Sequence, residues 1–117
     1  MDSSEIILAL SALAQSTRLD VFRRLVRAEP EGCAAGEIAG ALDVPNNTLS
    51  AHLAILARAG LVDSERRGRT IIYRARMERV RALVLFLLKD CCNGAPELCA
   101  PLIADFSPCC PAPAVPE

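Results

Sequence analysis

The feature that most constrains this chain of 117 residues is the helical spacing of the apolar residues in its first half. Four successive stretches share that spacing, and we expect helices over residues 4–14, 17–28, 35–42 and 46–58. The third and fourth are separated only by Asp43, Val44 and Pro45, which predicts a tight turn. Aromatic residues make up only 3% of the chain, so Leu, Val, Ile and Ala must fill the core. The chain is therefore expected to form a mainly helical domain.

The fourth predicted helix has one apolar face and one small, polar face. Leu49, Leu53 and Leu56 fall together on a helical wheel. Short polar side chains occupy its first turns: Asn46, Asn47, Thr48 and Ser50. His52 is the only histidine and lies on the flank, where a structural hydrogen bond and a ligand contact are equally good interpretations. Nothing bulky prevents this surface from entering a groove.

A basic hairpin is expected after this helix. Two extended segments, residues 61–65 and 70–75, flank Arg66, Arg67, Gly68 and Arg69, and three arginines at a turn favour contact with phosphate. The formal net charge is −1, but residues 46–90 hold nine basic and four acidic side chains. A local positive surface on a near-neutral protein is what nucleic-acid binding requires.

The last predicted helix, residues 77–92, is apolar on nearly all sides between residues 82 and 88. A terminal helix of this kind needs cover from a partner subunit, so we expect a dimer. The apolar run is far shorter than the roughly 20 residues that cross a bilayer. The first residues carry acid where a secretory signal carries Lys or Arg. These features predict a cytoplasmic protein with no membrane partner.

A short helix, a tight turn, a polar second helix and a basic hairpin together predict a winged helix-turn-helix, mainly α with a small β-hairpin. Residues 14–19 (AQSTRL), 46–53 (NNTLSAHL) and 58–62 (RAGLV) make this prediction more specific. Over residues 5–92 the chain resembles the ArsR/SmtB family of metal-responsive repressors. The resemblance implies a homodimer, joined through helices 4–14 and 77–92, that binds double-stranded operator DNA. We assign the DNA contacts to Asn46, Asn47, Thr48, Ser50, His52, Arg66, Arg67 and Arg69.

Residues 93–117 differ in composition from the predicted DNA-binding and dimerisation domain, residues 1–92. Five of the six cysteines lie at positions 91, 92, 99, 109 and 110, and six of the eight prolines lie in the same part of the chain. The prolines prevent a long helix or a central strand, so we expect a mostly irregular tail. Because cytosolic thiols stay reduced, these cysteines favour soft-metal or redox chemistry over a disulfide scaffold.

The candidate sensor site consists of Cys91, Cys92 and Cys99. Family members that sense through their third helix carry Cys-x-Cys there, which residues 34–41 lack, and those that bind zinc on the fifth helix need histidine, which residues 77–92 lack. The remaining thiols resemble those of arsenite-responsive repressors, whose ligands lie at the end of that helix. Trivalent arsenic takes three thiolates, and the break at Asn93-Gly94 lets the chain return Cys99 to the pair. We therefore expect As(III), with Sb(III) as a second candidate, to act as inducer without an organic cofactor.

Several alternatives stay open at this stage. The thiols also suit a redox-responsive repressor or a sensor of Cd, Zn or Pb with the same fold, while an arsenic metallochaperone leaves the basic hairpin unexplained. Cys91 and Cys92 could simply close the helix against the core, and Cys109 and Cys110 could be accessory thiols, a fourth ligand or without a role. Cys33 is interpreted as a packing residue. The arginines of residues 17–28 are interpreted as a solvated face.

An enzyme is not expected. A phosphatase-like arsenate reductase needs an arginine six positions after its cysteine, and none of the six cysteines has one. We find neither a Ser/His/Asp set nor a glycine-rich phosphate loop.

Overall fold

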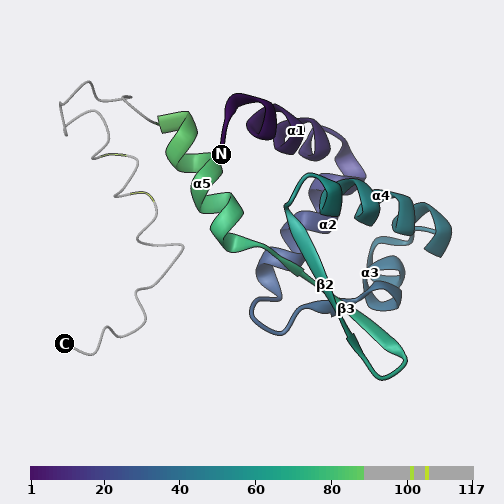
Figure 1. Ribbon diagram of the computed structural model, residues 1–117. Helices are drawn as coiled ribbons and strands as arrows, with labels where there is room; N and C mark the ends of the chain where they lie inside the picture. The colour runs from purple at the N-terminus through teal and green to yellow at the C-terminus, as the bar shows by residue number, and fades with distance from the viewer. Residues whose placement is uncertain (89–100, 102–104, 106–117) are drawn as a thin grey trace, which may run out of the picture. The chain divides into compact units, whose positions relative to one another are not determined.

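The computed structural model describes residues 1–88 together with Pro101 and Asp105 (Figure 1). Its elements are α1 (Ser3–Leu13), α2 (Ser16–Arg27), β1 (Cys33–Ala34), α3 (Ala35–Leu42), α4 (Asn46–Arg58), β2 (Val62–Arg67), β3 (Thr70–Ala75) and α5 (Met77–Leu88). Met1–Leu83 forms one compact unit, and Val84 begins a second. None of the helices in the described part of the chain is both long enough and apolar enough to cross a membrane. The predicted boundary after residue 92 lies outside the described residues.

The ends of the first helices have clear local causes. Asp2 caps α1, because its Oδ1 accepts a hydrogen bond from the Glu5 N–H at 2.9 Å while Glu5 Oε1 accepts one from the Asp2 N–H at 2.9 Å. The backbone bond from Glu5 holds the pKa of Asp2 below its usual range. At the other end of the motif, α3 stops at Asp43, which adopts the left-handed conformation with φ 55°. This residue makes the tight turn into α4, so the predicted helix-turn-helix is confirmed.

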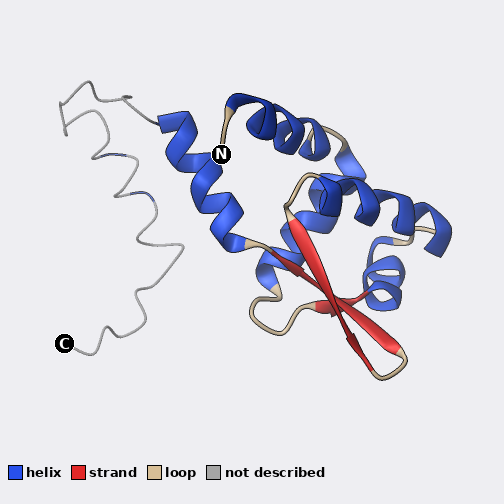
Figure 2. Cartoon of the chain, in the orientation of Figure 1, coloured by secondary structure: helices blue, strands red, loops and turns tan. Residues whose placement is uncertain are grey.

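The strands form one antiparallel sheet in the order β1-β3-β2 (Figure 2). Strand β1 was not expected, and it pairs Cys33 with Tyr73. The prediction that residues 66–69 separate the strands is wrong in part. Arg66 and Arg67 lie in β2, and Arg67 pairs with Thr70. The turn itself is only Gly68 and Arg69, with Gly68 at φ 63° as a type II′ turn requires.

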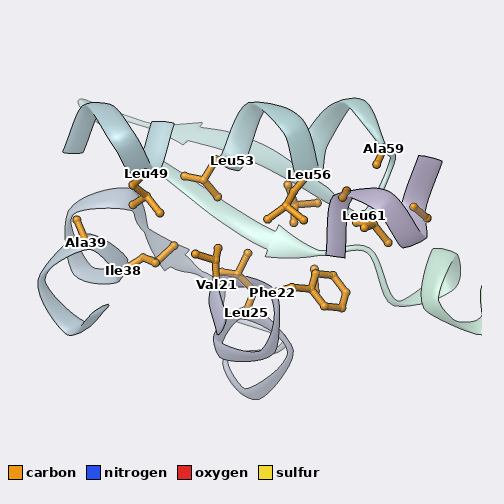
Figure 3. Close-up of a cluster of buried hydrophobic side chains, with 14 residues drawn as sticks. Val21, Phe22, Leu25, Ile38, Ala39, Leu49, Leu53, Leu56, Ala59 and Leu61 are labelled. Atoms are coloured by element: carbon orange, nitrogen blue, oxygen red, sulfur yellow. The ribbon is translucent and has the colours of Figure 1, made fainter. Parts of the chain in front are cut away.

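The core lies among α2, α3, α4 and the base of the hairpin (Figure 3). Leu49, Leu53 and Leu56 point inward from α4, as the wheel predicts, and each is at most 2% exposed. They face Ile38 of α3 and Leu25 of α2 (Figure 3). Full burial of one such side chain is worth about 1.5–3 kcal/mol relative to exposure. This packing fixes α4 with its polar face directed away from the core.

The helical spacing of residues 4–14 places Ile6, Ile7, Leu10 and Leu13 on one apolar stripe, of which α1 buries only a part. Ile6 is buried, but Ile7 and Leu10 are 63% and 41% exposed. Helix α1 instead buries Ala9 and Ala12, whose small side chains allow close packing on its neighbours. The helix is apolar on two sides, and spacing alone does not show which side meets the core.

Candidate nucleic-acid interface

The first turns of α4 present the predicted polar residues to solvent. Asn46, Asn47, Thr48 and Ser50 are all exposed. Pro45 stands at the N-cap and gives no side-chain cap, while the Thr48 N–H donates to Asn47 Oδ1 at 2.8 Å. The amide nitrogen of Asn47 therefore remains available as a donor. An exposed helix N-terminus with short polar side chains suits contact with an anion or with base edges.

Two predicted contact residues from separate elements line one hollow. Ser50 of α4 and Arg69 of the hairpin tip border an open hollow of about 470 Å³. Its other lining residues come from the start of α3 and from β3, namely Ala34, Ala35, Gly36, Thr70, Ile71 and Tyr73. Sequence reasoning did not single out these lining residues, because they meet only through the pairing of β1 with β3. The hairpin and the polar end of α4 thus share one surface.

The three arginines of the hairpin are not equivalent. Val62 and Ala75 are paired and buried, which defines the inner face of the hairpin. Because side chains alternate along a strand and paired residues share a face, Arg66 lies on the inner face and Arg67 on the outer one.

The ion pairs on the outer face reinforce this difference. Arg67 Nη2 lies 3.3 Å from Glu65 Oε1, and Arg74 contacts the same carboxylate. Among the described residues, Arg66 and Arg69 form no ion pair. Among the residues that the structure describes, these two hairpin arginines therefore have no carboxylate beside them, while Arg67 and Arg74 share one.

His52 is half-buried and contacts Arg18 of α2. Arg18 Nη1 lies 3.4 Å from His52 Nδ1, and Arg18 Nε donates to the Ala12 carbonyl at 2.6 Å. The expectation that the arginines of α2 form a solvated face is wrong for Arg18 and for Arg24, which are half-buried. Sequence reasoning missed the role of Arg18, although it belongs to the run 14–19 that carries the family resemblance.

The predicted thiol site cannot be located, because Cys91, Cys92, Cys99, Cys109 and Cys110 lie outside the described residues. Within the described part of the chain, no group of three His, Cys, Asp or Glu side chains is placed to hold a metal ion. Cys33 is half-buried in strand β1, and burial followed by the charge of Glu37 raises the pKa of its thiol. It is therefore a poor thiolate ligand, in keeping with a packing role.

Two helices carry large exposed apolar side chains. Helix α1 exposes Ile7, Leu8 and Leu10, and α5 exposes Leu85 and Leu87, which are 58% and 55% exposed. Exposed apolar side chains gathered on one element are typical of a contact with another protein surface.

Comparison with known sequences identifies a helix-turn-helix domain over residues 13–65. The transcriptional activator HlyU of Vibrio cholerae is 30% identical over 93 residues, which are 80% of this chain and 83% of that protein. A biofilm growth-associated repressor of Agrobacterium fabrum is 33% identical over 95 residues, covering 81% of this chain and 77% of the repressor. The repressor SmtB of Mycobacterium tuberculosis is 38% identical over 76 residues, covering 65% of this chain and 54% of SmtB.

Solved structures agree with this result. An ArsR-like transcriptional regulator from a Rhodococcus species superposes with TM-score 0.68 at 27% identity, covering 83% of this chain and 89% of the other. The homodimeric winged helix-turn-helix DNA-binding domain of Mb0332 from Mycobacterium bovis superposes with TM-score 0.59 at 32% identity. The superposition covers 74% of this chain and 81% of the other. Reduced HlyU from Vibrio cholerae superposes with TM-score 0.61 at 29% identity, covering 74% of this chain and 88% of the other.

Proposed function

Because this chain belongs to the ArsR/SmtB family of winged helix-turn-helix transcriptional regulators, we propose that it is a homodimeric repressor released from its operator by trivalent arsenic. One observation carries the DNA-binding part of the proposal. Ser50, in the exposed polar first turns of α4, and Arg69, which forms no ion pair with the described residues, border the same hollow. In this arrangement α4 enters the major groove while the hairpin lies along the neighbouring phosphate backbone.

Homodimerisation is supported by the exposed apolar residues of α1 and α5. It is also supported by the similarity to the homodimeric domain of Mb0332. A dimer with two-fold symmetry presents two α4 helices to major grooves about 34 Å apart, so the operator is an inverted repeat.

The inducer part of the proposal depends on the sequence of the tail. Cys91, Cys92 and Cys99 offer three thiolates, the number that As(III) takes, whereas zinc and cadmium favour a fourth ligand. Binding to these cysteines, which follow α5 in the sequence, acts on the helix that sets the separation of the two α4 helices. A coupling free energy of about 1–3 kcal/mol per site is the usual range for such regulation.

A thiol redox switch is the second candidate. It is favoured by the similarity to HlyU, one structure of which is described as reduced. Two sulfurs suffice for such a switch, and oxidation then releases DNA without any metalloid. The HlyU of Vibrio cholerae is a transcriptional activator, so activation of transcription is an alternative to repression.

Selection of bound sequences from random DNA tests the DNA-binding part. We expect an enriched inverted repeat whose half-sites lie about one helical turn apart, and a footprint that covers both. A reporter placed behind this sequence should be repressed by the protein. Enrichment of no common sequence would contradict the proposed function, and increased transcription would show an activator instead.

Single replacements of the tail thiols test the trigger. Cys91→Ser, Cys92→Ser and Cys99→Ser should each leave operator affinity intact and abolish release by arsenite, because two thiolates bind As(III) far more weakly than three. The matched control is the double variant Cys109→Ser and Cys110→Ser, which should respond like the natural chain. Normal release from the Cys99→Ser variant would refute the three-thiolate site.

A further inference from the structure

Arg18 links three helices at a point directly behind α4. Its Nε donates to the carbonyl of Ala12 at the end of α1 at 2.6 Å. Its Nη1 lies 3.4 Å from Nδ1 of His52 on α4. Gln15 Oε1 accepts from the Arg18 backbone N–H at 2.8 Å, which fixes the start of α2. No carboxylate among the described residues forms an ion pair with this guanidinium.

The contact between Arg18 and His52 favours one of the two neutral forms of the imidazole. A guanidinium has five N–H donors and no acceptor. It can therefore form a hydrogen bond with Nδ1 only if Nδ1 holds a lone pair. In the neutral imidazole the proton must then lie on Nε2. Arg18 thus makes Nε2 a hydrogen-bond donor.

His52 Nε2 is free to use this donor outside the protein. The nitrogen makes no hydrogen bond with the described residues, and it is not among their buried polar atoms without a partner. His52 itself is half-buried on the flank of α4, two positions after the exposed Ser50. A donor on the flank of a recognition helix lies beside the DNA backbone when the front of the helix faces base edges.

We propose that Arg18 is a positioning residue that holds His52 as the Nε2–H tautomer, so that His52 donates a hydrogen bond to a phosphate oxygen of the operator. The cation behind the ring polarises the imidazole and favours an anionic acceptor over a base edge. This inference rests on the proposed DNA binding and assigns two residues to it. It also explains why Arg18 is turned toward α4 instead of solvent.

The tautomer can be measured in the free protein. The chain has one histidine, so a two-bond ¹H–¹⁵N correlation spectrum of labelled protein contains a single imidazole. At a pH where the ring is neutral, we expect the Nε2–H pattern, with Nδ1 in the unprotonated range and hydrogen-bonded. Arg18→Met should shift the Nδ1 resonance and admit the second tautomer. An Nδ1–H pattern in the natural chain, or a spectrum unchanged by Arg18→Met, would refute the inference without reference to DNA.

Two replacements of His52 separate its two nitrogens. Asn places an acceptor near the position of Nδ1 and has no outer donor, whereas Gln places a donor near the position of Nε2 and loses the acceptor toward Arg18. We expect His52→Asn to weaken operator binding about tenfold, which corresponds to about 1.4 kcal/mol. His52→Gln should bind within about threefold of the natural chain, or about 0.7 kcal/mol. Equal losses in both variants would show that the outer donor does not contact DNA.

A double-mutant cycle shows whether Arg18 acts through His52. Arg18→Met should weaken operator binding about five- to tenfold in the natural chain and by less than about twofold in the His52→Gln background. Urea unfolding of each variant confirms that it is folded. If Arg18→Met costs the same affinity in both backgrounds, Arg18 has a general structural role and the inference fails. Failure of the natural chain to bind any selected DNA would instead refute the proposed function.

Discussion

Replacing Arg66 with alanine tests the difference between the two faces of the hairpin. Arg66 lies on the inner face with no ion pair among the described residues, while Arg67 lies on the outer face and pairs with Glu65. We expect Arg66→Ala to weaken binding to all DNA sequences, because phosphate contacts carry no sequence information. Arg67→Ala is the matched control, since it removes the same charge from the neighbouring position.

The size of the effect follows from counterion release. The slope of log K against log salt is negative, and each lost phosphate contact reduces its magnitude by about 0.9. A homodimer loses one contact per subunit, so the magnitude of its slope falls by about 1.8. At about 0.15 M salt the same relation predicts that each lost contact weakens the affinity about fivefold. The two lost contacts of the dimer together weaken it about 30-fold. Arg67→Ala should change the slope by less than Arg66→Ala does, because Arg67 lies beside the Glu65 carboxylate that it shares with Arg74.

Fluorescence anisotropy of a labelled operator, measured at several salt concentrations, gives both the affinity and the slope. The expected order of losses is Arg66→Ala first and Arg67→Ala clearly second. Equal slopes for the two variants would refute the assignment of faces. An unchanged slope for Arg66→Ala would show that this arginine contacts no phosphate.

Three further predictions concern the domain that supports this surface. Leu56→Ala should lower the free energy of unfolding by about 2–5 kcal/mol in urea titration, because Leu56 is fully buried, and a loss below about 1 kcal/mol would contradict the assigned core. Gly60→Ala should cost about 1–2 kcal/mol because Gly60 has φ 80°, while the added Cβ, 2.5 Å from Arg79 Nε, requires only that this flexible side chain move aside. The control Gly40→Ala should raise stability by about 0.5–1 kcal/mol, since nothing lies within 4 Å of the added Cβ, and a loss there would contradict the helix. Cys33 should react with iodoacetamide more slowly than a small free thiol at mildly alkaline pH, because its raised pKa leaves less thiolate. Peptide mass spectrometry measures the rate of this reaction, and a faster reaction than that of the free thiol would contradict the raised pKa.

The helices and the inward face of α4 were predictable because local spacing determines them. Strand β1 was not, because two residues carry no periodic signal and their strand conformation depends on pairing with the distant Tyr73. The position of Arg66 and Arg67 within β2 likewise depends on hairpin register, which the turn at Gly68 sets.

In the candidate site, too, some features follow from the local sequence and others depend on tertiary packing. Its exposed polar residues on α4 were read directly from the sequence, because exposure follows from the burial of the opposite face. The role of Arg18 was not, because its contacts with Ala12 and His52 depend on how three helices cross. An arginine at helical spacing among other arginines resembles a solvated face until that packing is known.

Titration of inducers into the protein–operator complex tests the central claim most directly. Arsenite, zinc, cadmium and peroxide are each added to reduced protein bound to labelled operator, and release is followed by anisotropy. We predict that arsenite releases the DNA at a concentration close to that of the three-thiolate sites. Zinc and cadmium should cause much weaker release at the same concentration, and peroxide should cause none. Release by peroxide that a thiol reductant reverses, together with no response to arsenite, would contradict the arsenic-responsive mechanism and favour the redox switch.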